Sequence, residues 1–189
     1  MKFLKRLVPL TIGLLLAVPL AAQSPSNADE FRRFEVYAAP LSYSRQGQLN
    51  SLGAGASLTV NLTDSFGLVA DFSFHRSSLK ARDPQMMLFR GGPRIILSRH
   101  GRIRTFAQGL VGQAIVTQGV GELFSNPGPG YNRFTAFTML IGGGADVAFK
   151  PWLALRPVDV GYSAFNASKL QFGGWSSGVR ISSGLVIRF

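Results

Sequence analysis

The sequence predicts an all-β protein: an eight-stranded antiparallel transmembrane β-barrel with short periplasmic turns and longer extracellular loops, preceded by a signal peptide. Apolar and polar residues alternate along the chain in repeated segments of about ten residues, which is typical of strands that face lipid on one side and a polar interior on the other. These segments number eight, and tight and long connections alternate between them.

The N-terminus has the features of a secretory signal peptide. A basic start with Lys2 and Lys5 precedes a mainly apolar run over residues 7–20, and the small residues Ala21 and Ala22 follow. The run is short for a membrane anchor and is interrupted by two prolines. We therefore expect an exported chain that is divided into a signal peptide (1–22), a short periplasmic N-terminal segment (23–32) and a transmembrane barrel (33–189).

Composition narrows the classes of partner. Later in the chain no run reaches 18 consecutive apolar residues, so helical spans are not expected.

Removal of three basic residues with the signal peptide lowers the net charge from +11 to +8, and this balance favours anionic partners such as lipid phosphates. Nucleic acid is not expected, because an exported chain without basic clusters among its aromatics does not fit that role. Cysteine is absent, and a closed barrel, which pairs all its backbone groups, does not need disulfides.

Three hairpins account for six of the strands. Residues 51–61 and 66–75 alternate cleanly on either side of a turn that contains Asp64 and Ser65. The same unit recurs over residues 86–98 with 102–117, and over residues 134–149 with 152–163. A first strand over residues 34–44 and a last one over residues 175–189 complete the eight.

The connections support this count. Tight ones at 62–65, 99–101 and 150–151 alternate with longer ones at 45–50, 76–84, 118–133 and 164–174. Such alternation is expected when short turns lie in the periplasm together with both chain ends. One strand needs a correction: Arg156 and Asp159 have opposite parity on either side of Pro157, and a β-bulge there restores the pattern.

The last strand, WSSGVRISSGLVIRF, carries bulky apolar residues on one face and glycine, serine and arginine on the other. It ends on an aromatic residue, Phe189. This pattern favours a lipid-facing wall, but parity alone does not tell the inside of a barrel from its outside. A soluble, lipocalin-like ligand-binding barrel, with its apolar face inside, therefore stays an alternative.

The segments FEVYAAPLSYS, LFRGGPRIIL, GGGADVAFKPWLALRPVDVGY and GVRISSGLVIRF together resemble the small OmpA/OmpX-like outer-membrane β-barrel proteins. The resemblance covers nearly all of the mature sequence and implies this fold and an outer-membrane location. Phe189 resembles the signal that the outer-membrane assembly machinery reads, which makes that machinery an expected partner. We expect a monomer.

Charged residues at the alternate positions that form the polar face of each strand are expected to form a network in the barrel lumen. The interior of an eight-stranded barrel is just wide enough for side chains to fill, and buried charges need partners. The network favours a salt-bridged plug, whereas a narrow porin for small anions is the alternative, since arginines outnumber carboxylates. Its predicted members are Glu35, Asp71, Arg90, Arg94, Asp146, Arg156, Arg180 and Arg188.

The residue types argue against catalysis. With no cysteine and two histidines, thiol chemistry and most metal sites are not expected, so we predict no catalytic residue, no metal site and no cofactor. A lipid A-modifying hydrolase built on His75 and Ser77 is a further alternative, because the two share a strand face as a triad-like pair would. The acid near that end is Glu122, on a different loop.

Cations in the second long connection are expected to contact lipopolysaccharide. Arg76, Lys80 and Arg82 lie where they can donate charge-assisted hydrogen bonds to its phosphates. The sequence thus predicts a non-catalytic outer-membrane barrel with a structural or surface-interaction role, in contact with outer-membrane lipid and lipopolysaccharide.

Overall fold

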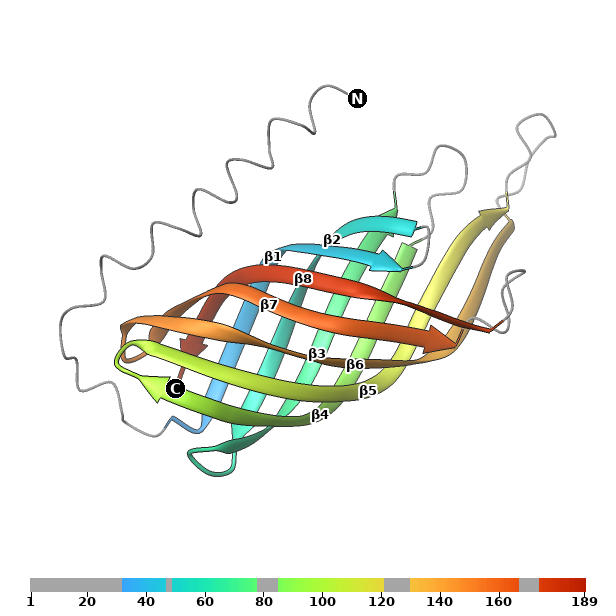
Figure 1. The fold of residues 1–189 in the computed structure, drawn as a ribbon. Helices are drawn as coiled ribbons and strands as arrows, with labels where there is room; N and C mark the ends of the chain where they lie inside the picture. Colours follow the sequence, from blue (N-terminus) through green and yellow to red (C-terminus); the bar gives the residue numbers. More distant parts are fainter. Residues whose placement is uncertain (1–31, 47–48, 78–84, 121–129, 167–173) are drawn as a thin grey trace, which may run out of the picture.

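The computed structural model describes residues 32–46, 49–77, 85–120, 130–166 and 174–189, which form one closed antiparallel β-barrel (Figure 1). Each strand pairs with its neighbours in sequence, and β8 pairs with β1 to close the barrel. The predicted fold is confirmed; the predicted signal peptide lies outside the described residues. In chain order the strands are β1 (Phe34–Gln46), β2 (Leu49–Asn61), β3 (Phe66–Ser77), β4 (Gln85–His100), β5 (Ile103–Val120), β6 (Gly130–Lys150), β7 (Leu153–Asn166) and β8 (Trp175–Arg188).

The barrel has two different ends. At the turn end lie the connections 62–65, 101–102 and 151–152 together with the start of β1 and the end of β8. Thr63 shapes the first of these turns, since its Oγ1 accepts hydrogen bonds from the backbone N–H groups of Ser65 and Phe66. Gly101 has a φ of 56°, a left-handed conformation that favours glycine in the second turn. The opposite end, which carries the other four connections, is called the loop end.

The prediction of a long connection over residues 45–50 is wrong. β1 continues to Gln46, β2 begins at Leu49, and Arg45 pairs directly with Asn50. Tyr43 supports this pairing, because its hydroxyl donates to Asn50 Oδ1 over 2.8 Å. Polar residues continue the strands here because the rim of a membrane barrel meets water and headgroups, where apolar character is not required.

The two faces of the wall differ sharply. Bulky apolar side chains such as Leu41, Phe137 and Ile181 are exposed on the outside, whereas arginines and carboxylates are buried inside. A continuous apolar exterior of this kind needs lipid around it. The soluble, lipocalin-like alternative, which requires the opposite arrangement, is therefore wrong. None of the described residues belongs to a helix that is long and apolar enough to span a membrane.

Two bulges keep the polar residues inside. The register of β1 shifts between Ala39 and Ser42, next to Pro40, and the register of β7 against β8 shifts between Arg156 and Asp159. The β-bulge predicted at Pro157 is thereby confirmed. Each shift reverses the parity, because the extra residue leaves one strand one position ahead of its partner. As a result Arg156 and Asp159 both point inward.

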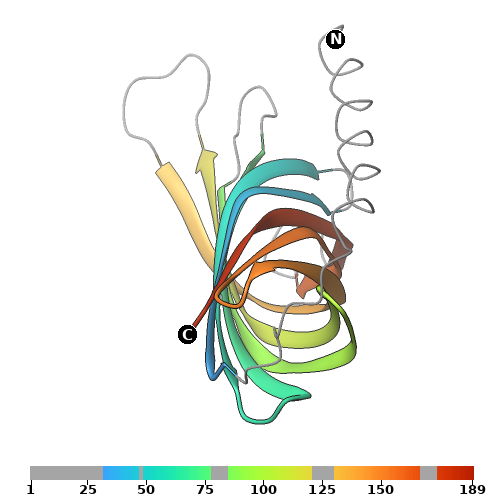
Figure 2. The same ribbon diagram turned by 90° about the vertical axis from the view of Figure 1, so that its left-hand side faces the viewer.

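The β5–β6 hairpin extends beyond its neighbours at the loop end (Figures 1 and 2). The pairing of β5 with β6 runs as far as Val120 and Gly130, whereas the pairing of β6 with β7 begins at Thr138 and Phe165. Within the described residues, the stretch 130–137 of β6 therefore pairs with β5 alone. The hairpin gives the barrel an asymmetric rim.

Candidate functional site

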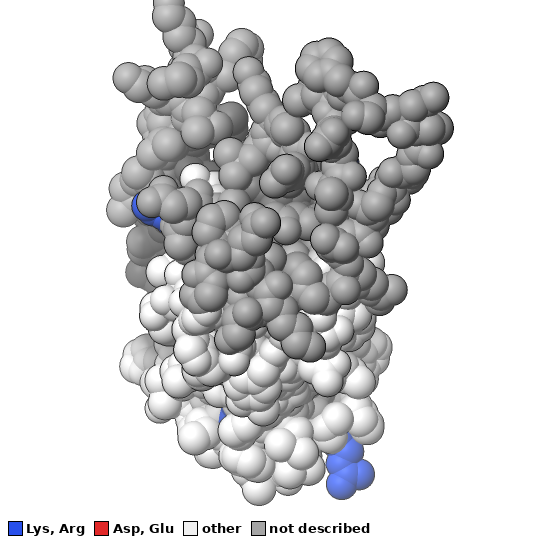
Figure 3. All heavy atoms as spheres, turned by 90° about the vertical axis from the view of Figure 1, so that its right-hand side faces the viewer, with Lys and Arg blue, Asp and Glu red and all other residues white. Residues whose placement is uncertain are grey.

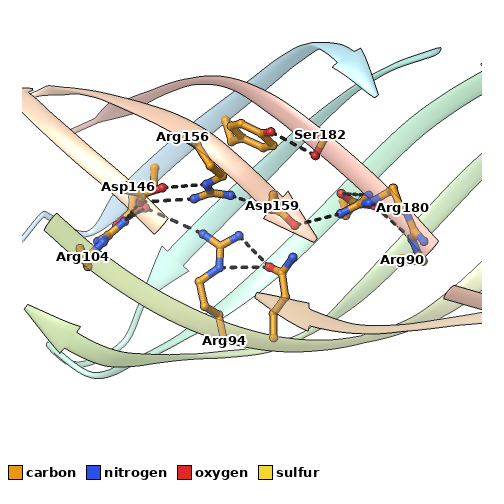
Figure 4. A network of polar contacts seen from close by, with 12 residues as sticks. Arg90, Arg94, Arg104, Asp146, Arg156, Asp159, Arg180 and Ser182 are labelled. Carbon is orange, nitrogen blue, oxygen red and sulfur yellow. Dashed lines mark hydrogen bonds and ion pairs between the residues drawn. The ribbon is translucent and has the colours of Figure 1, made fainter. Parts of the chain in front are cut away.

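The lumen contains a continuous ladder of ion pairs along the barrel axis (Figure 4). Carboxylates and guanidinium groups alternate in it, so that each carboxylate joins two or more arginines. Seven strands, all except β2, contribute a charge to it. From the turn end to the loop end the ladder runs Glu35, Arg104, Asp146, Arg156, Asp159, Arg180, Asp71 and Arg90.

Arg104 and Asp146 hold the turn-end half together. Arg104 crosses the lumen from β5 and donates to both oxygens of Glu35 on β1, over 2.5 and 2.6 Å. Its Nη2 also donates to Asp146 over 2.7 Å, and Arg188 donates to the same carboxylate over 3.0 Å. Asn61 Nδ2 completes the shell of Glu35 at 2.8 Å. A buried carboxylate with several donors keeps its charge, so this half is strongly cross-linked.

Aromatic rings separate the charges in the middle of the lumen. The Phe106 ring lies between two guanidinium groups, with Arg94 at 4.4 Å and Arg156 at 4.3 Å from its centroid. Arg156 also stacks on Tyr37 at 4.3 Å and donates to Asp146 over 2.7 Å. Arg94 donates through two nitrogens to Gln108 Oε1, and its nearest carboxylate oxygen lies 4.0 Å away. Arg94, Phe106, Arg156 and Tyr37 therefore form one stack inside the barrel.

Asp71 organises the loop-end half. It accepts from Arg90 over 2.7 Å and from Arg180 over 3.1 Å, and so joins β3, β4 and β8. Arg90 continues to the hydroxyls of Ser73 and Ser163, which lie on opposite sides of it. Beyond these residues the buried side chains include the polar Ser44 and Gln46 as well as an apolar cluster of Ala136 and Phe165, against which Met86 packs.

The structure brings all eight predicted lumen residues into the interior. It adds two that the sequence analysis missed, Arg104 and Asp159. Arg104 shares its parity with Gln108 in the fifth strand, and this signal was masked by Gln113, which has the opposite parity and faces outward. Asp159 was left out of the predicted network, although the bulge predicted at Pro157 reverses the parity after Arg156 and turns Asp159 inward. With Arg94 and Arg188, which lie beside the ladder, the described lumen charges are six arginines and four carboxylates, so the lumen carries excess positive charge.

His75 has a structural partner in the lumen. It is buried, and its Nε2 lies 3.0 Å from Ser42 Oγ on β1, a contact made possible by the bulge at Pro40. The side chain of Ser77 and the whole of Glu122 lie outside what the structure describes. No carboxylate accepts from the other nitrogen of His75 among the described residues. A serine and histidine without an orienting acid do not form a triad.

Two exposed arginines lie on the outer wall at the loop end. Arg76, predicted to contact lipopolysaccharide, lies at the end of β3, and Arg45, which the sequence analysis placed in a loop, lies at the end of β1. Figure 3 views this end and shows Lys and Arg atoms, but no Asp or Glu atoms, on the described surface. The other two predicted contacts, Lys80 and Arg82, lie outside the described residues.

Phe189 lies at the seam where the barrel closes. Its backbone N–H donates to the carbonyl oxygen of Phe34 over 2.8 Å, while its side chain is exposed at the turn end. The Phe189 ring therefore lies on the outer surface of the barrel beside the closing pair of strands.

Among solved structures, the chain is similar to Neisserial surface protein A, with a TM-score of 0.64, 14% sequence identity, and coverage of 82% of this chain and 97% of that chain. It is also similar to Ail, the attachment invasion locus protein of Yersinia pestis, with a TM-score of 0.52, 15% identity and coverage of 82% and 96%. The outer membrane protein OprG from Pseudomonas aeruginosa has a TM-score of 0.52, 11% identity and coverage of 87% and 99%. No protein-family model and no curated protein matches the sequence. The chain therefore has the fold of the small eight-stranded outer-membrane β-barrels, and its apolar outer wall suits it to that membrane.

Proposed function

We propose that the chain is a non-catalytic outer-membrane barrel with a closed lumen, which acts as a rigid structural support for a surface-interaction site at its loop end. The observation that carries this proposal is the unbroken ion-pair ladder. Each carboxylate in it is bound by two or more guanidinium groups, and the Phe106 stack occupies the middle of the lumen. A path for ions would require these contacts to break.

A narrow anion porin is the second candidate, because the described lumen charges are six arginines and four carboxylates. Single-channel recording in planar bilayers distinguishes the closed barrel from the anion porin. The closed lumen gives no steady current in the unaltered protein. A steady, anion-selective current in that protein, with altered conductance in the Arg90→Ala, Arg94→Ala and Arg180→Ala variants, would refute the plug and establish the porin.

Two features support a surface role. The β5–β6 hairpin projects beyond the rest of the rim, and elsewhere at the loop end the outer wall carries Arg45 on β1 and Arg76 on β3. Ail, whose fold is similar, has been crystallised with the heparin analogue sucrose octasulfate. We infer that Arg76, with Lys80, Arg82 and Arg45, contacts the phosphates of lipopolysaccharide, since guanidinium groups bind phosphate through paired, charge-assisted hydrogen bonds.

The lipopolysaccharide contact is tested by urea unfolding in vesicles with and without purified lipopolysaccharide. Lipopolysaccharide is expected to raise the urea midpoint of the unaltered protein, and an Arg45→Gln/Arg76→Gln variant is expected to lose most of that rise. Arg33→Gln, an exposed arginine at the turn end, serves as the matched control. An equal rise in all three proteins would exclude these arginines as the contact.

The hydrolase alternative is tested directly by mass spectrometry of lipid A. A non-catalytic barrel leaves the lipid A profile of cells unchanged whether or not the chain is expressed. Loss of an acyl chain on expression, abolished by Ser77→Ala, would overturn the non-catalytic assignment.

A further inference from the structure

Two exposed aromatic rings lie together on the outer wall at the loop end. Phe137 on β6 and Trp175 on β8 are 49% and 55% exposed, and their ring centroids lie 6.2 Å apart in an edge-to-face arrangement at 86°. β7 lies between these two strands (Figure 1) and ends at Asn166, which pairs with Trp175. The two rings therefore meet across the end of β7, and they are called the aromatic pair.

The aromatic pair is packed on one side and open on the other. Ala164, near the end of β7, has the same outward parity as Tyr162, yet it is 5% exposed whereas Tyr162 is 57% exposed. This burial indicates that larger side chains of the neighbouring strands lie over the small alanine. Packing against the wall and the edge-to-face contact together restrict the two rings. The pair thus presents a preformed apolar surface to the outside.

The aromatic pair lies further from the membrane centre than the arginine proposed to contact phosphate. Val179 on β8 pairs with Arg45 on one side and with Tyr162 on the other, and Trp175 lies four residues closer to the loop end. At a rise of about 3.3 Å per residue and a strand tilt of about 40°, Trp175 lies about 10 Å beyond Val179 along the barrel axis. Interfacial aromatic residues favour the headgroup level, which is the level of Tyr162. That preference does not account for Trp175.

The surroundings favour a phosphorylated carbohydrate at this height. Among the described residues every aspartate and glutamate lies in the lumen, except Asp64 in a turn at the opposite end. The described outer wall at the loop end therefore carries no carboxylate that would repel phosphate. The face of an aromatic ring is the negative part of its quadrupole, and it attracts the weakly positive C–H groups on the face of a sugar ring. Arg45 and the aromatic pair thus suit a phosphate and a sugar at successive heights.

We propose that the aromatic pair binds a sugar ring of the lipopolysaccharide core, above the phosphates that Arg45 contacts. The C–H face of the sugar lies on the indole of Trp175, and Phe137 holds the indole in place from its edge. This inference rests on the function proposed above and adds carbohydrate to phosphate as a determinant of binding. Lipid A carries phosphates and acyl chains but no core sugar, so it is the ligand that separates the two contacts.

The two tryptophans of the chain provide matched reporters. In the full chain, Trp152→Phe leaves Trp175 as the only reporter, and Trp175→Phe leaves Trp152 at the turn end. Each protein is refolded into phospholipid vesicles that contain no addition, purified lipid A, or lipopolysaccharide with its core, present in both leaflets so that either orientation of the barrel meets it. Quenching of the fluorescence by acrylamide then measures the access of water to each indole.

Lipopolysaccharide should lower the quenching constant of Trp175 by roughly half, because a sugar covers one of the two ring faces. Lipid A should leave that constant nearly unchanged, and Trp152 should respond to neither. Trp175→Leu should raise the lipopolysaccharide content needed for half of the rise in urea midpoint by roughly two- to ten-fold, without changing the response to lipid A. Trp175→Tyr should keep most of the effect. Tyr162→Leu, which removes an equally exposed ring at the headgroup level, should affect the two ligands alike.

Several results would overturn the proposal. Equal shielding of Trp175 by lipid A and lipopolysaccharide would mean contact with the lipid anchor instead of the core. If lipopolysaccharide raises the urea midpoint through Arg45 but leaves Trp175 open to acrylamide, the function proposed above stands and the sugar site does not. Shielding that follows the ratio of protein to lipid, without lipopolysaccharide, would mean that a second copy covers the pair. The change in mobility between unheated and boiled samples on a gel confirms that each variant is folded.

Discussion

Replacing Asp146 with asparagine tests whether the ladder stabilises the barrel. Asp146 is fully buried and accepts from Arg156 over 2.7 Å, from Arg104 over 2.7 Å and from Arg188 over 3.0 Å. Asparagine keeps the shape and one acceptor but removes the charge, which leaves three guanidinium groups with fewer carboxylates. Removing one partner of a buried pair typically costs about 3–5 kcal/mol.

The structure favours the lower end of this range. Arg104 keeps both bonds to Glu35, Arg156 keeps Asp159 at 3.3 Å, and the side chains of Arg104 and Arg188 are 12% and 10% exposed, so water screens part of the loss. We expect a loss of about 3 kcal/mol, or roughly a hundred-fold in the unfolding equilibrium. Urea titration in lipid vesicles, with the folded fraction read from unheated gels, measures it.

Two controls make the test specific. Asp64→Asn removes an exposed carboxylate in a turn and should change the stability by less than about 0.5 kcal/mol. Arg104→Gln combined with Asp146→Asn removes one of the excess cations, so the double variant should be more stable than the sum of the single losses predicts. If Asp146→Asn unfolds at the same urea concentration as the unaltered protein, water in the lumen solvates the three arginines as well as the carboxylate does. The ladder would then not stabilise the barrel.

Three further outcomes are expected. Gly112→Ala places a Cβ 1.9 Å from the carbonyl oxygen of Phe89 and should lower the free energy of unfolding by about 1–3 kcal/mol in the same urea titration. Gly109→Ala on the same strand meets nothing within 4 Å and should leave the stability unchanged. Equal effects of the two variants would contradict the close approach of β4 to β5 at Gly112. Phe106→Ala removes the ring between Arg94 and Arg156 and should cost about 3–5 kcal/mol, with Phe106→Leu losing less because it keeps most of the buried volume. Phe189→Ser should reduce membrane insertion in cells without slowing refolding of the purified protein into vesicles. If refolding into vesicles also becomes slow, Phe189 contributes to folding itself and not to recognition.

The strand count and the direction of most side chains could be predicted from alternation alone. Each strand repeats its apolar positions with a period of two, so the face of a residue follows from its neighbours until a bulge intervenes. Asp159 shows the limit: it lies two residues after Pro157, and a register shift that spans this proline reverses its face. The sequence signal was the proline, which cannot donate to the ladder.

Proline alone is still not sufficient to locate a bulge. Pro40 and Pro157 lie within register shifts, whereas β4 and β3 keep one register through Pro93. Pro93 follows Gly91 and Gly92, and the backbone approaches Gly92 closely, since a Cβ there would lie 2.1 Å from the carbonyl oxygen of Gly109. The glycine pair lets the neighbouring strands pack past the proline without an added residue. A rule that counts prolines without their glycine neighbours would therefore have misplaced Arg94.

The lumen ladder explains what parity could not decide, namely which face of the wall is inside. Glu35 on β1 meets Arg104 on β5, and Asp71 on β3 meets Arg180 on β8, although neither pair of strands is adjacent. On the outer surface of a barrel such strands point away from one another and their side chains do not meet. Contacts between distant strands form only across the interior, so the complementary charges themselves identify the polar face as the lumen. The apolar face then has to meet lipid, and the orientation of the whole wall follows from these pairs.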